Sequence, residues 1–231
     1  MKKLYIILFC LIYFPLVGQK NIHHRWNSQL KKYVSESGIV NYKSWKKDQG
    51  QLETYIMTLS QFPPSEIVSI DYKLAYWINA YNALTVKLIL KYYPLNSIKE
   101  IKNPWNVKCF STGDKEYSLG DIEHKILRKM DEPRIHFAIN CASKSCPKLL
   151  NEAYTEKKIE NQLNSVTKLF LLDKTKNQLN ENKLFLSKIF LWFGKDFGSK
   201  KMMLEFITKY SKINLMQSKV NYLSYNWDLN E

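Results

Sequence analysis

Two cysteines, Cys141 and Cys146, lie five residues apart in the segment RIHFAINCASKSCP, residues 134–147. A thiolate is a nucleophile and a metal ligand, and two neighbouring thiols can form a disulfide. The pair is therefore compatible with a catalytic cysteine, a disulfide, part of a metal site, or simple packing. The choice depends on which side chains the fold brings to Cys141.

A nucleophilic thiol needs a base within hydrogen-bond reach, and two histidines are near in sequence. Apolar and polar residues alternate over residues 134–140, which predicts a β-strand. In a strand, His136 would lie about 16 Å from Cys141 and on the opposite face. The strand prediction therefore excludes His136 as the base and favours His124, delivered from a separate helix.

A long apolar helix is predicted from Asp71, as its N-cap, to the residue before Pro94. Asn79 and Asn82 interrupt its apolar surface on one face, and Trp77 is a candidate binding residue beside them. A buried amide without a partner costs about 1–3 kcal/mol. The two asparagines therefore either bond the backbone of a neighbouring loop, or form part of a site, where they would orient an imidazole or donate to an oxyanion.

A second helix is predicted to begin at Ser118, with Asp121 three residues on, in a variant of the capping box. Asp121, His124 and Arg128 share one face of this helix. Asp121 either orients His124 or serves only the helix cap.

A disulfide between Cys141 and Cys146 would close a short loop and add about 2 kcal/mol. Cys109 would then be left as a free thiol. Zinc could draw on Cys141, Cys146, His124 and His136. These residues are divided among a helix, a strand and a loop, and do not form the compact pairs of a zinc ribbon. We therefore expect no metal and no cofactor.

The N-terminus predicts export. Two lysines precede the uncharged apolar run LYIILFCLIYFPLVG, and the chain turns polar at Gln19. This run is short for a membrane span and typical of a signal peptide. We expect residues 1–19 to be a signal peptide and residues 20–231 to form a single domain, which is periplasmic or secreted and has no membrane span. An uncleaved N-terminal anchor is the alternative.

The chain is basic, with 35 Lys and Arg against 21 Asp and Glu and a net charge of +14. Only Arg25, Arg128 and Arg134 are arginines, and the lysines are scattered along the chain. Bidentate recognition of phosphates and bases favours arginine, so nucleic acid is not the expected partner. An anionic component of the cell envelope remains as a partner class. No GxSxG, HExxH, P-loop or dinucleotide-binding motif is present in the sequence.

Helical periodicity dominates the first half, and strands are interspersed later without a regular βαβ alternation. The sequence predicts an α+β single domain whose helical first half packs on a mainly antiparallel sheet. Besides these two helices and the strand over residues 134–140, we expect a hairpin over 105–119, a helix over 155–172, a strand over 183–187, helices over 186–197 and 201–211, and a closing strand over 219–227.

Six segments together resemble the successive blocks of domain of unknown function family 547: WINAYNALTVKLIL, YSLGDIEHKILR, RIHFAINCASKSCP, EAYT, LSKIFLWFGKDF and YNWDLN. They run in order from about Val40 to Asn230. The resemblance implies no activity, substrate or cofactor. It does mark as motif positions Asn79, Asn82, Asp121, His124, His136, Cys141, Cys146 and Asp196, and it leaves Cys109 in a more variable block.

Two hypotheses remain open. In the first, the protein is a thiol-dependent hydrolase or acyl transferase, with Cys141 as nucleophile, His124 as base, and Asn79 and Asn82 in support. In the second, it is a non-catalytic binding or interaction domain with a buried polar network and a Cys141–Cys146 disulfide. The candidate binding residues around the site are His136, Asp121, Cys146 and Trp77.

Overall fold

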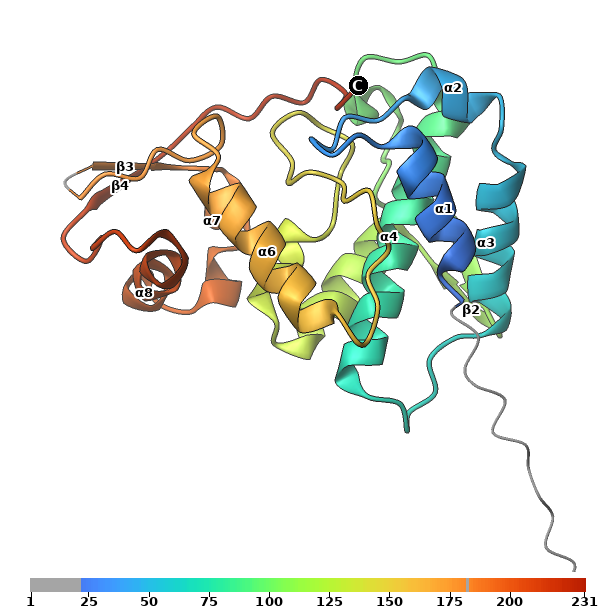
Figure 1. The fold of residues 1–231 in the computed structure, drawn as a ribbon, viewed down its shortest axis with the longest axis horizontal. Coiled ribbons are helices and arrows are strands. Elements are labelled where there is room, and N and C mark those ends of the chain that lie inside the picture. The colour runs from blue at the N-terminus through green and yellow to red at the C-terminus, as the bar shows by residue number, and fades with distance from the viewer. Residues whose placement is uncertain (1–21, 182) are drawn as a thin grey trace, which may run out of the picture.

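The longest helix, α4 (Ile70–Tyr92), runs through the helical half of the molecule (Figure 1), and its residues from Leu74 to Leu90 are almost all buried. The computed structural model describes residues 22–181 and 183–231, and the predicted signal peptide lies outside them. Ser69, rather than the expected Asp71, caps α4 by accepting a hydrogen bond from the Tyr72 N–H. Asp71 lies in the first turn, where its charge favours the positive end of the helix dipole.

Three helices pack beside α4 on one side (Figure 1): α1 (His24–Tyr33), α2 (Tyr42–Lys46) and α3 (Gly50–Gln61). They are joined by stacked aromatic rings. The centroid of Trp26 lies 5.8 Å from that of Trp45 and 5.7 Å from that of Tyr55. None of the helices in the described residues is both long enough and apolar enough to cross a bilayer.

The predicted hairpin is confirmed as β1 (Phe110–Thr112) and β2 (Lys115–Tyr117), an antiparallel pair that turns at Gly113 with a φ of +55°. A positive φ is accessible to glycine at little cost. Trp77 of α4 packs against this hairpin, with ring centroids 6.3 Å from Phe110 and 5.4 Å from Tyr117. Trp77 is therefore a core residue.

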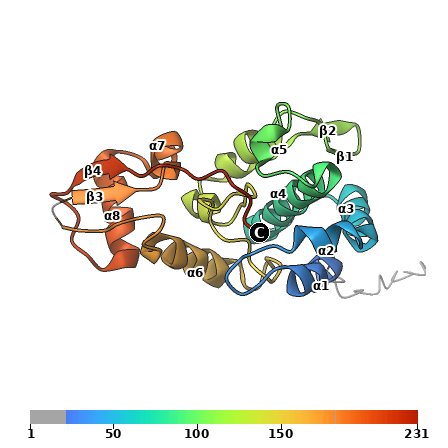
Figure 2. The ribbon, with the colours of Figure 1, turned by 90° about the horizontal axis from the view of Figure 1, so that it is seen from above.

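The second half contains α6 (Ile159–Leu172), β3 (Lys183–Leu186), α7 (Ile189–Trp192), α8 (Lys200–Ser211) and β4 (Lys219–Tyr222). Strands β3 and β4 pair in parallel, and α7 and α8 supply the crossover (Figure 2) that a parallel pair requires. The α+β prediction is confirmed. In the described residues its strands form one antiparallel and one parallel two-stranded sheet. Short 3-10 turns lie at Ile98–Glu100 and Gly194–Phe197.

The strand predicted over residues 134–140 is wrong. Pro133–Phe137 form a 3-10 helix, with Pro133 in its first turn and the Glu132 side chain accepting a hydrogen bond from the Arg134 N–H. Proline presets the φ angle of a helix start, so these local cap contacts oppose an extended backbone. Residues 135–140 are all buried, so the alternation of apolar and polar residues does not correspond to a buried and an exposed face.

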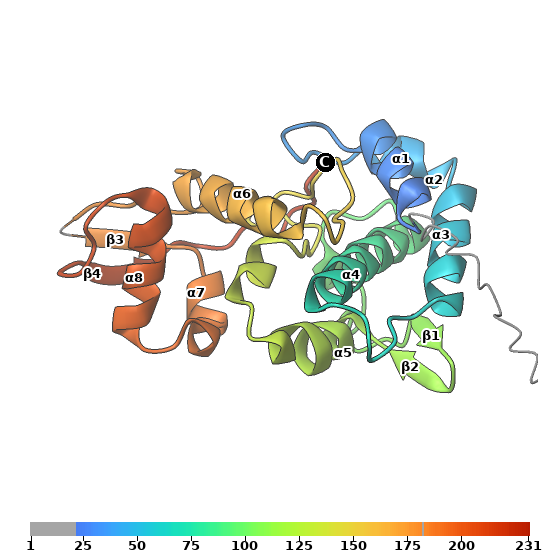
Figure 3. The ribbon, with the colours of Figure 1, turned by 60° about the horizontal axis from the view of Figure 1, so that its bottom comes forward.

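The segment after Ser118 has an irregular backbone. It begins as α5 (Leu119–Asp121), continues as a π-helical turn (Ile122–Ile126) and ends as a 3-10 turn (Leu127–Met130). Figure 3 shows α5 running close beside α4, and the two are in contact. A π turn adds one residue per turn and rotates the side chains that follow, and such turns are frequent at functional sites.

After β4 the chain runs in an extended form back across the molecule toward α2 (Figure 1). This C-terminal segment, residues 223–231, pairs with the loop that contains the two cysteines: Lys144 N–H donates to the Asp228 carbonyl, and Ser145 N–H to the Asn226 carbonyl. It also bonds to the first half, because Val40 N–H donates to the Asn230 carbonyl. Residues far apart in sequence thereby meet around the cysteine loop.

Candidate functional site

A cavity of about 260 Å³ opens beside the cysteine loop. Its walls come from α4, the π-helical turn, the segment 136–147, α7 and the C-terminal segment. The lining residues are Tyr81, Trp105, Glu123, His124, His136, Ile139, Cys141, Cys146, Pro147, Ile189, Trp192, Phe193, Tyr225 and Trp227. A larger hollow of about 1020 Å³ lies around residues 58–72, but none of its described lining residues is a cysteine, so we place the candidate site at the smaller cavity.

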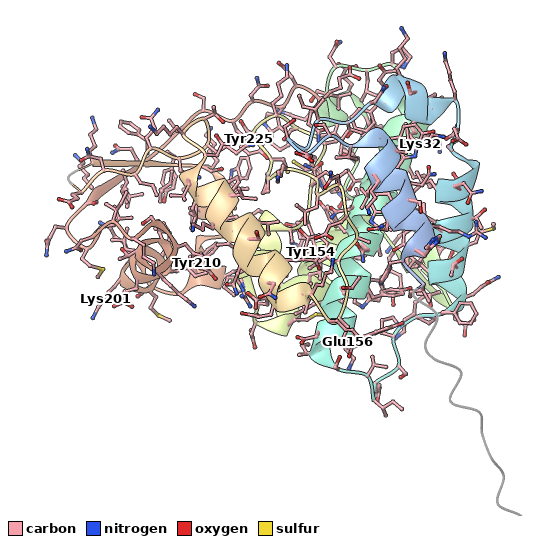
Figure 4. The ribbon with its side chains drawn as sticks, in the orientation of Figure 1. Lys32, Tyr154, Glu156, Lys201, Tyr210 and Tyr225 are labelled. Carbon is pink, nitrogen blue, oxygen red and sulfur yellow. The ribbon has the colours of Figure 1, made fainter. Side chains whose placement is uncertain are left out.

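Cys141 is at the centre of a polar cluster. Its Sγ lies 2.9 Å from the Sγ of Cys146, 3.2 Å from the Oγ of Ser143 and 3.3 Å from the Oη of Tyr225. Both cysteines are free thiols here, as is Cys109, so the disulfide of the second hypothesis is not formed. Tyr225 reaches the cluster from the extended C-terminal segment (Figure 4).

These contacts make Cys141 the more acidic thiol. The hydrogen bond with Cys146 and those with Ser143 and Tyr225 lower the pKa of Cys141 to about 7, against the opposing effect of burial. Burial raises the pKa of Cys146 well above its usual value. A thiolate can only accept hydrogen bonds, so an ionised Cys141 would be stabilised by the proton that Cys146 retains.

The backbone at Cys141 is held in an unusual conformation. The next residue, Ala142, has a φ of +58°. This value lies in the left-handed region that residues with a β-carbon rarely adopt. The Asn140 side chain accepts from the Ala142 N–H at 2.8 Å and donates to the Pro147 carbonyl at 2.7 Å. Such strain costs about 1–3 kcal/mol and persists only where the surroundings hold it.

Asn79 and Asn82 are both buried, and both bond loop backbone. Asn82 donates to the Ala138 carbonyl at 3.0 Å and accepts from the Asn140 N–H at 2.8 Å. Asn79 makes the same pair of bonds to the backbone of Tyr154, at 2.8 and 3.0 Å. Neither side chain lines the cavity. Asn82 positions the segment that leads into Cys141, whereas Asn79 holds a different loop.

His136 lines the same cavity as Cys141, and the strand geometry on which its exclusion as the base rested is absent. Its Nε2 lies 2.8 Å from an oxygen of Asp196. Arg128 donates two hydrogen bonds to the same carboxylate, at 2.6 and 2.7 Å. Burial lowers the pKa of His136 to about 4, so the ring is neutral at pH 7. The hydrogen bond from Arg128 holds the pKa of Asp196 below its usual value. The carboxylate therefore accepts the Nε2 proton and leaves Nδ1 as the basic nitrogen.

His124, the expected base, lies exposed at the rim of the cavity. Its Nδ1 is 3.3 Å from Arg128 Nη1, and burial together with the Arg128 charge lowers its pKa. Among the described residues, neither His124 nor His136 makes a hydrogen bond with Cys141. Asp121 accepts from the backbone and side chain of Ser118 and pairs with two lysines, so it serves the helix cap rather than His124.

Glu123 is a member of the site that the sequence did not reveal. It is 6% exposed, and the Tyr81 hydroxyl donates to it at 3.3 Å. Burial, with a smaller contribution from the Cys141 charge, raises the pKa of Glu123 to about 7. Its neighbour in sequence, His124, points to the rim. The sequence alone does not indicate whether a charged side chain in a π-helical turn points into the protein or toward solvent.

Aromatic side chains form one wall of the cavity. Tyr225 and Trp227 of the C-terminal segment contact each other and Trp192 of α7, with ring centroids 4.6–5.7 Å apart, and Trp105 lies 5.8 Å from Trp227. The sequence pattern does not mark these four aromatics as a group. Only the return of the C-terminal segment brings them together beside Cys141.

The family model described as "Protein of unknown function, DUF547" matches residues 66–171. Residues 66–171 therefore match this family, which confirms the resemblance that the sequence blocks indicate. The matched span is shorter than the stretch from 40 to 230 over which the sequence blocks resemble it, and it contains Glu123, His136, Cys141 and Cys146. No curated protein and no solved structure matches the chain.

The cavity therefore combines a thiol, a neutral imidazole held by a carboxylate, and a buried carboxyl group. The predicted residues that line it are Cys141, Cys146, His124 and His136, and those that do not are Asn79, Asn82, Asp121 and Trp77. Within residues 22–181 and 183–231, no three His, Cys, Asp or Glu side chains are grouped so as to hold a metal ion. The side chains present suit nucleophilic and acid–base chemistry.

Proposed function

We propose that this protein is a thiol-dependent hydrolase or acyl transferase, with Cys141 as the nucleophile. The observation that carries the proposal is one cavity lined both by a thiol whose pKa is lowered to about 7 and by an imidazole that a carboxylate orients. A nucleophile, a base and a group that orients the base are the parts that acyl transfer requires. His136, oriented by Asp196, replaces His124 as the proposed base.

The proposed reaction has two steps. The Cys141 thiolate attacks the carbonyl carbon of an ester or thioester, and the leaving group departs with a proton that His136 has taken from the thiol. Water, or a second acceptor, then attacks the acyl-cysteine after giving its proton to His136, and Cys141 is released. Hydrolysis and acyl transfer differ only in which acceptor enters.

Tyr225 suits the role of oxyanion donor in both steps. Its hydroxyl lies 3.3 Å from Cys141 Sγ, and burial raises its pKa far above the usual value, so it keeps its proton at any working pH. A fixed donor aimed at the developing negative charge stabilises the transition state. Glu123 is the other titratable group beside the thiol and is an alternative proton acceptor.

The test is to trap the acyl intermediate. The reduced protein would be mixed with p-nitrophenyl acetate, the release of p-nitrophenolate followed by stopped flow, and the acetyl group located by peptide mass mapping. We expect a burst close to one equivalent and an acetyl group on Cys141. His136→Gln should slow acylation by about 10²-fold, within the usual range for losing a general base, and the same measurement on Glu123→Gln identifies which residue is the base.

Cys109→Ser is the matched control, because Cys109 is a free, partly buried thiol that does not line the cavity. It should leave the burst unchanged, whereas Cys141→Ser should remove it. Absence of any acetyl-cysteine in the wild-type protein, or acetylation of Cys109 at the same rate, would contradict the proposed nucleophile.

We also propose export, on the strength of the sequence pattern of residues 1–19. Intact-mass measurement on native material should give an N-terminus near residues 19 to 21. Recovery of a chain that still begins at Met1 in the envelope fraction would instead support the N-terminal anchor. An anionic envelope component remains the proposed partner class, because the chain has a net charge of +14.

A further inference from the structure

We infer that the cavity beside Cys141 binds an uncharged aromatic acyl group, of the size of a phenylacetyl group, against its aromatic wall. This inference rests on the proposed function and names its substrate class. The wall consists of Trp105, Trp192, Tyr225 and Trp227, whose neighbouring ring centroids are 4.6–5.8 Å apart.

The exposure of these rings points to a ligand. The core tryptophans Trp26 and Trp45 are fully buried, whereas Trp192 is 44% exposed and faces the cavity. Trp227 and Tyr225 are half-buried. A group of aromatic rings left open to water beside a nucleophile gains most by covering its apolar surface with a ligand.

The charges of the lining select against ionised acyl groups. Among the described residues, no lysine or arginine lines the cavity. The His136 ring is neutral, and Glu123 is uncharged or anionic. Arg128 lies nearby, but both of its bonds to Asp196 are already formed. A carboxylate or phosphate on the acyl chain would therefore be buried without a cation, which is strongly unfavourable.

The size of the cavity suits a group of this kind. An apolar cavity of about 150 Å³ is large enough to accept benzene. The cavity beside Cys141 has a volume of about 260 Å³. The additional volume fits the carbonyl group and a short linker between the ring and Cys141. Flat rings suit a wall of neighbouring aromatic side chains, because offset and edge-on contacts between rings are favourable.

A series of p-nitrophenyl esters tests the inference: acetate, phenylacetate and hydrogen succinate. We expect kcat/KM to be about 10-fold higher for phenylacetate than for acetate, the scale of discrimination that an apolar pocket provides, and lowest for the charged succinate. Trp192→Ala should lower kcat/KM for phenylacetate by about 10-fold, mainly through KM, and change that for acetate less than about twofold.

Leu191→Ala is the matched control. Leu191 is the preceding residue on α7 and is 52% exposed, and it does not line the cavity, so its truncation should leave all three esters unaffected. Equal losses on acetate and phenylacetate in Trp192→Ala, or a preference for succinate or acetate in the wild type, would overturn the inference. An acetyl group on Cys141 would still support the proposed function in that case.

Binding of an unreactive ligand tests the aromatic site independently of the proposed acyl transfer. Phenylacetone has no leaving group, and calorimetric titration should detect its binding to the wild type and to Leu191→Ala but weaker binding to Trp192→Ala. If no ester acylates Cys141, the proposed function fails while this titration still decides whether the wall binds an aromatic group. Absence of binding to the wild type would refute the aromatic site.

Discussion

Iodoacetamide should alkylate Cys141 far faster than Cys109 in the folded, reduced protein at neutral pH. Both are free thiols, and neither is fully exposed. Their acidity differs. Hydrogen bonds, the largest from Cys146, lower the pKa of Cys141 to about 7, whereas burial raises the pKa of Cys109 to about 11.

The size of the difference follows from these two pKa values, which are about four pH units apart (11 minus 7). At pH 7 about half of Cys141 and about one part in 10⁴ of Cys109 is therefore thiolate. A less basic thiolate is also a weaker nucleophile, and a Brønsted coefficient of about 0.4–0.5 offsets about two of those four orders of magnitude. The net expectation is a rate ratio of about 10² at pH 7, which shrinks toward about 1 at pH 9 as Cys141 saturates and Cys109 continues to ionise.

The assay is a quenched time course of iodoacetamide labelling between pH 6 and 9, with each cysteine quantified by peptide mass mapping. Labelling in denaturing urea supplies the control, since both thiols should then react at the same rate. A Cys141 rate that continues to rise tenfold per pH unit up to pH 9 would refute a lowered pKa. Equal labelling of Cys109 and Cys141 at pH 7 in the folded protein would do the same.

Three further predictions concern the surroundings of the thiol. Cys146→Ala should raise the pH midpoint for Cys141 alkylation, because its hydrogen bond is the largest cause of the lowered pKa. Burial raises the pKa of Glu123 from 4.5 to about 7, so the folded protein keeps a proton that the unfolded chain releases between these values. The free energy of unfolding should therefore fall by about 3 kcal/mol as the pH rises from 4.5 to 7, at about 1.4 kcal/mol per pH unit. Urea unfolding at both pH values should show this fall in the wild type and not in Glu123→Gln. Asn82→Ala leaves the Asn140 N–H and a carbonyl without their partners. Urea unfolding of this variant should show a loss of about 2–5 kcal/mol.

A different result would contradict each of these three predictions. An unchanged alkylation midpoint in Cys146→Ala would remove the main cause proposed for the acidity of Cys141. Wild-type stability that rises from pH 4.5 to 7 relative to Glu123→Gln would mean that the buried carboxyl is held in its charged form. A loss of less than about 1 kcal/mol in Asn82→Ala would mean that water replaces the lost bonds.

Elements with strong local signals were predictable. The long apolar segment before Pro94 predicted the central helix, and the hairpin expected over 105–119 and the helix expected over 155–172 are present as β1–β2 and α6. The family blocks and the spacing of Cys141 and Cys146 also identified the segment on which the candidate site is built. These features depend on residues close together in sequence, so local physical chemistry specifies them.

The partners of Cys141 were decided only by the tertiary structure. The cap at Pro133 turns an apparent strand into a 3-10 helix, and His136 in this helix lines the same cavity as Cys141. A π-helical turn directs Glu123 inward, although nothing in its neighbours in sequence indicates it. Both depend on a balance between local backbone preference and burial, which periodicity alone does not resolve.

The sequence by itself thus indicated most of the helices, the hairpin, the family resemblance and the position of the two neighbouring cysteines. The tertiary structure alone decided which groups surround them, because Asp196, Trp192, Tyr225 and Trp227 come from segments much farther along the chain. The hydrogen bonds of the C-terminal segment to the Cys141–Cys146 loop and to residues 40 and 96 hold this segment beside the cavity. Such pairings bring together residues that share no local pattern, so their meeting appears only in the folded chain.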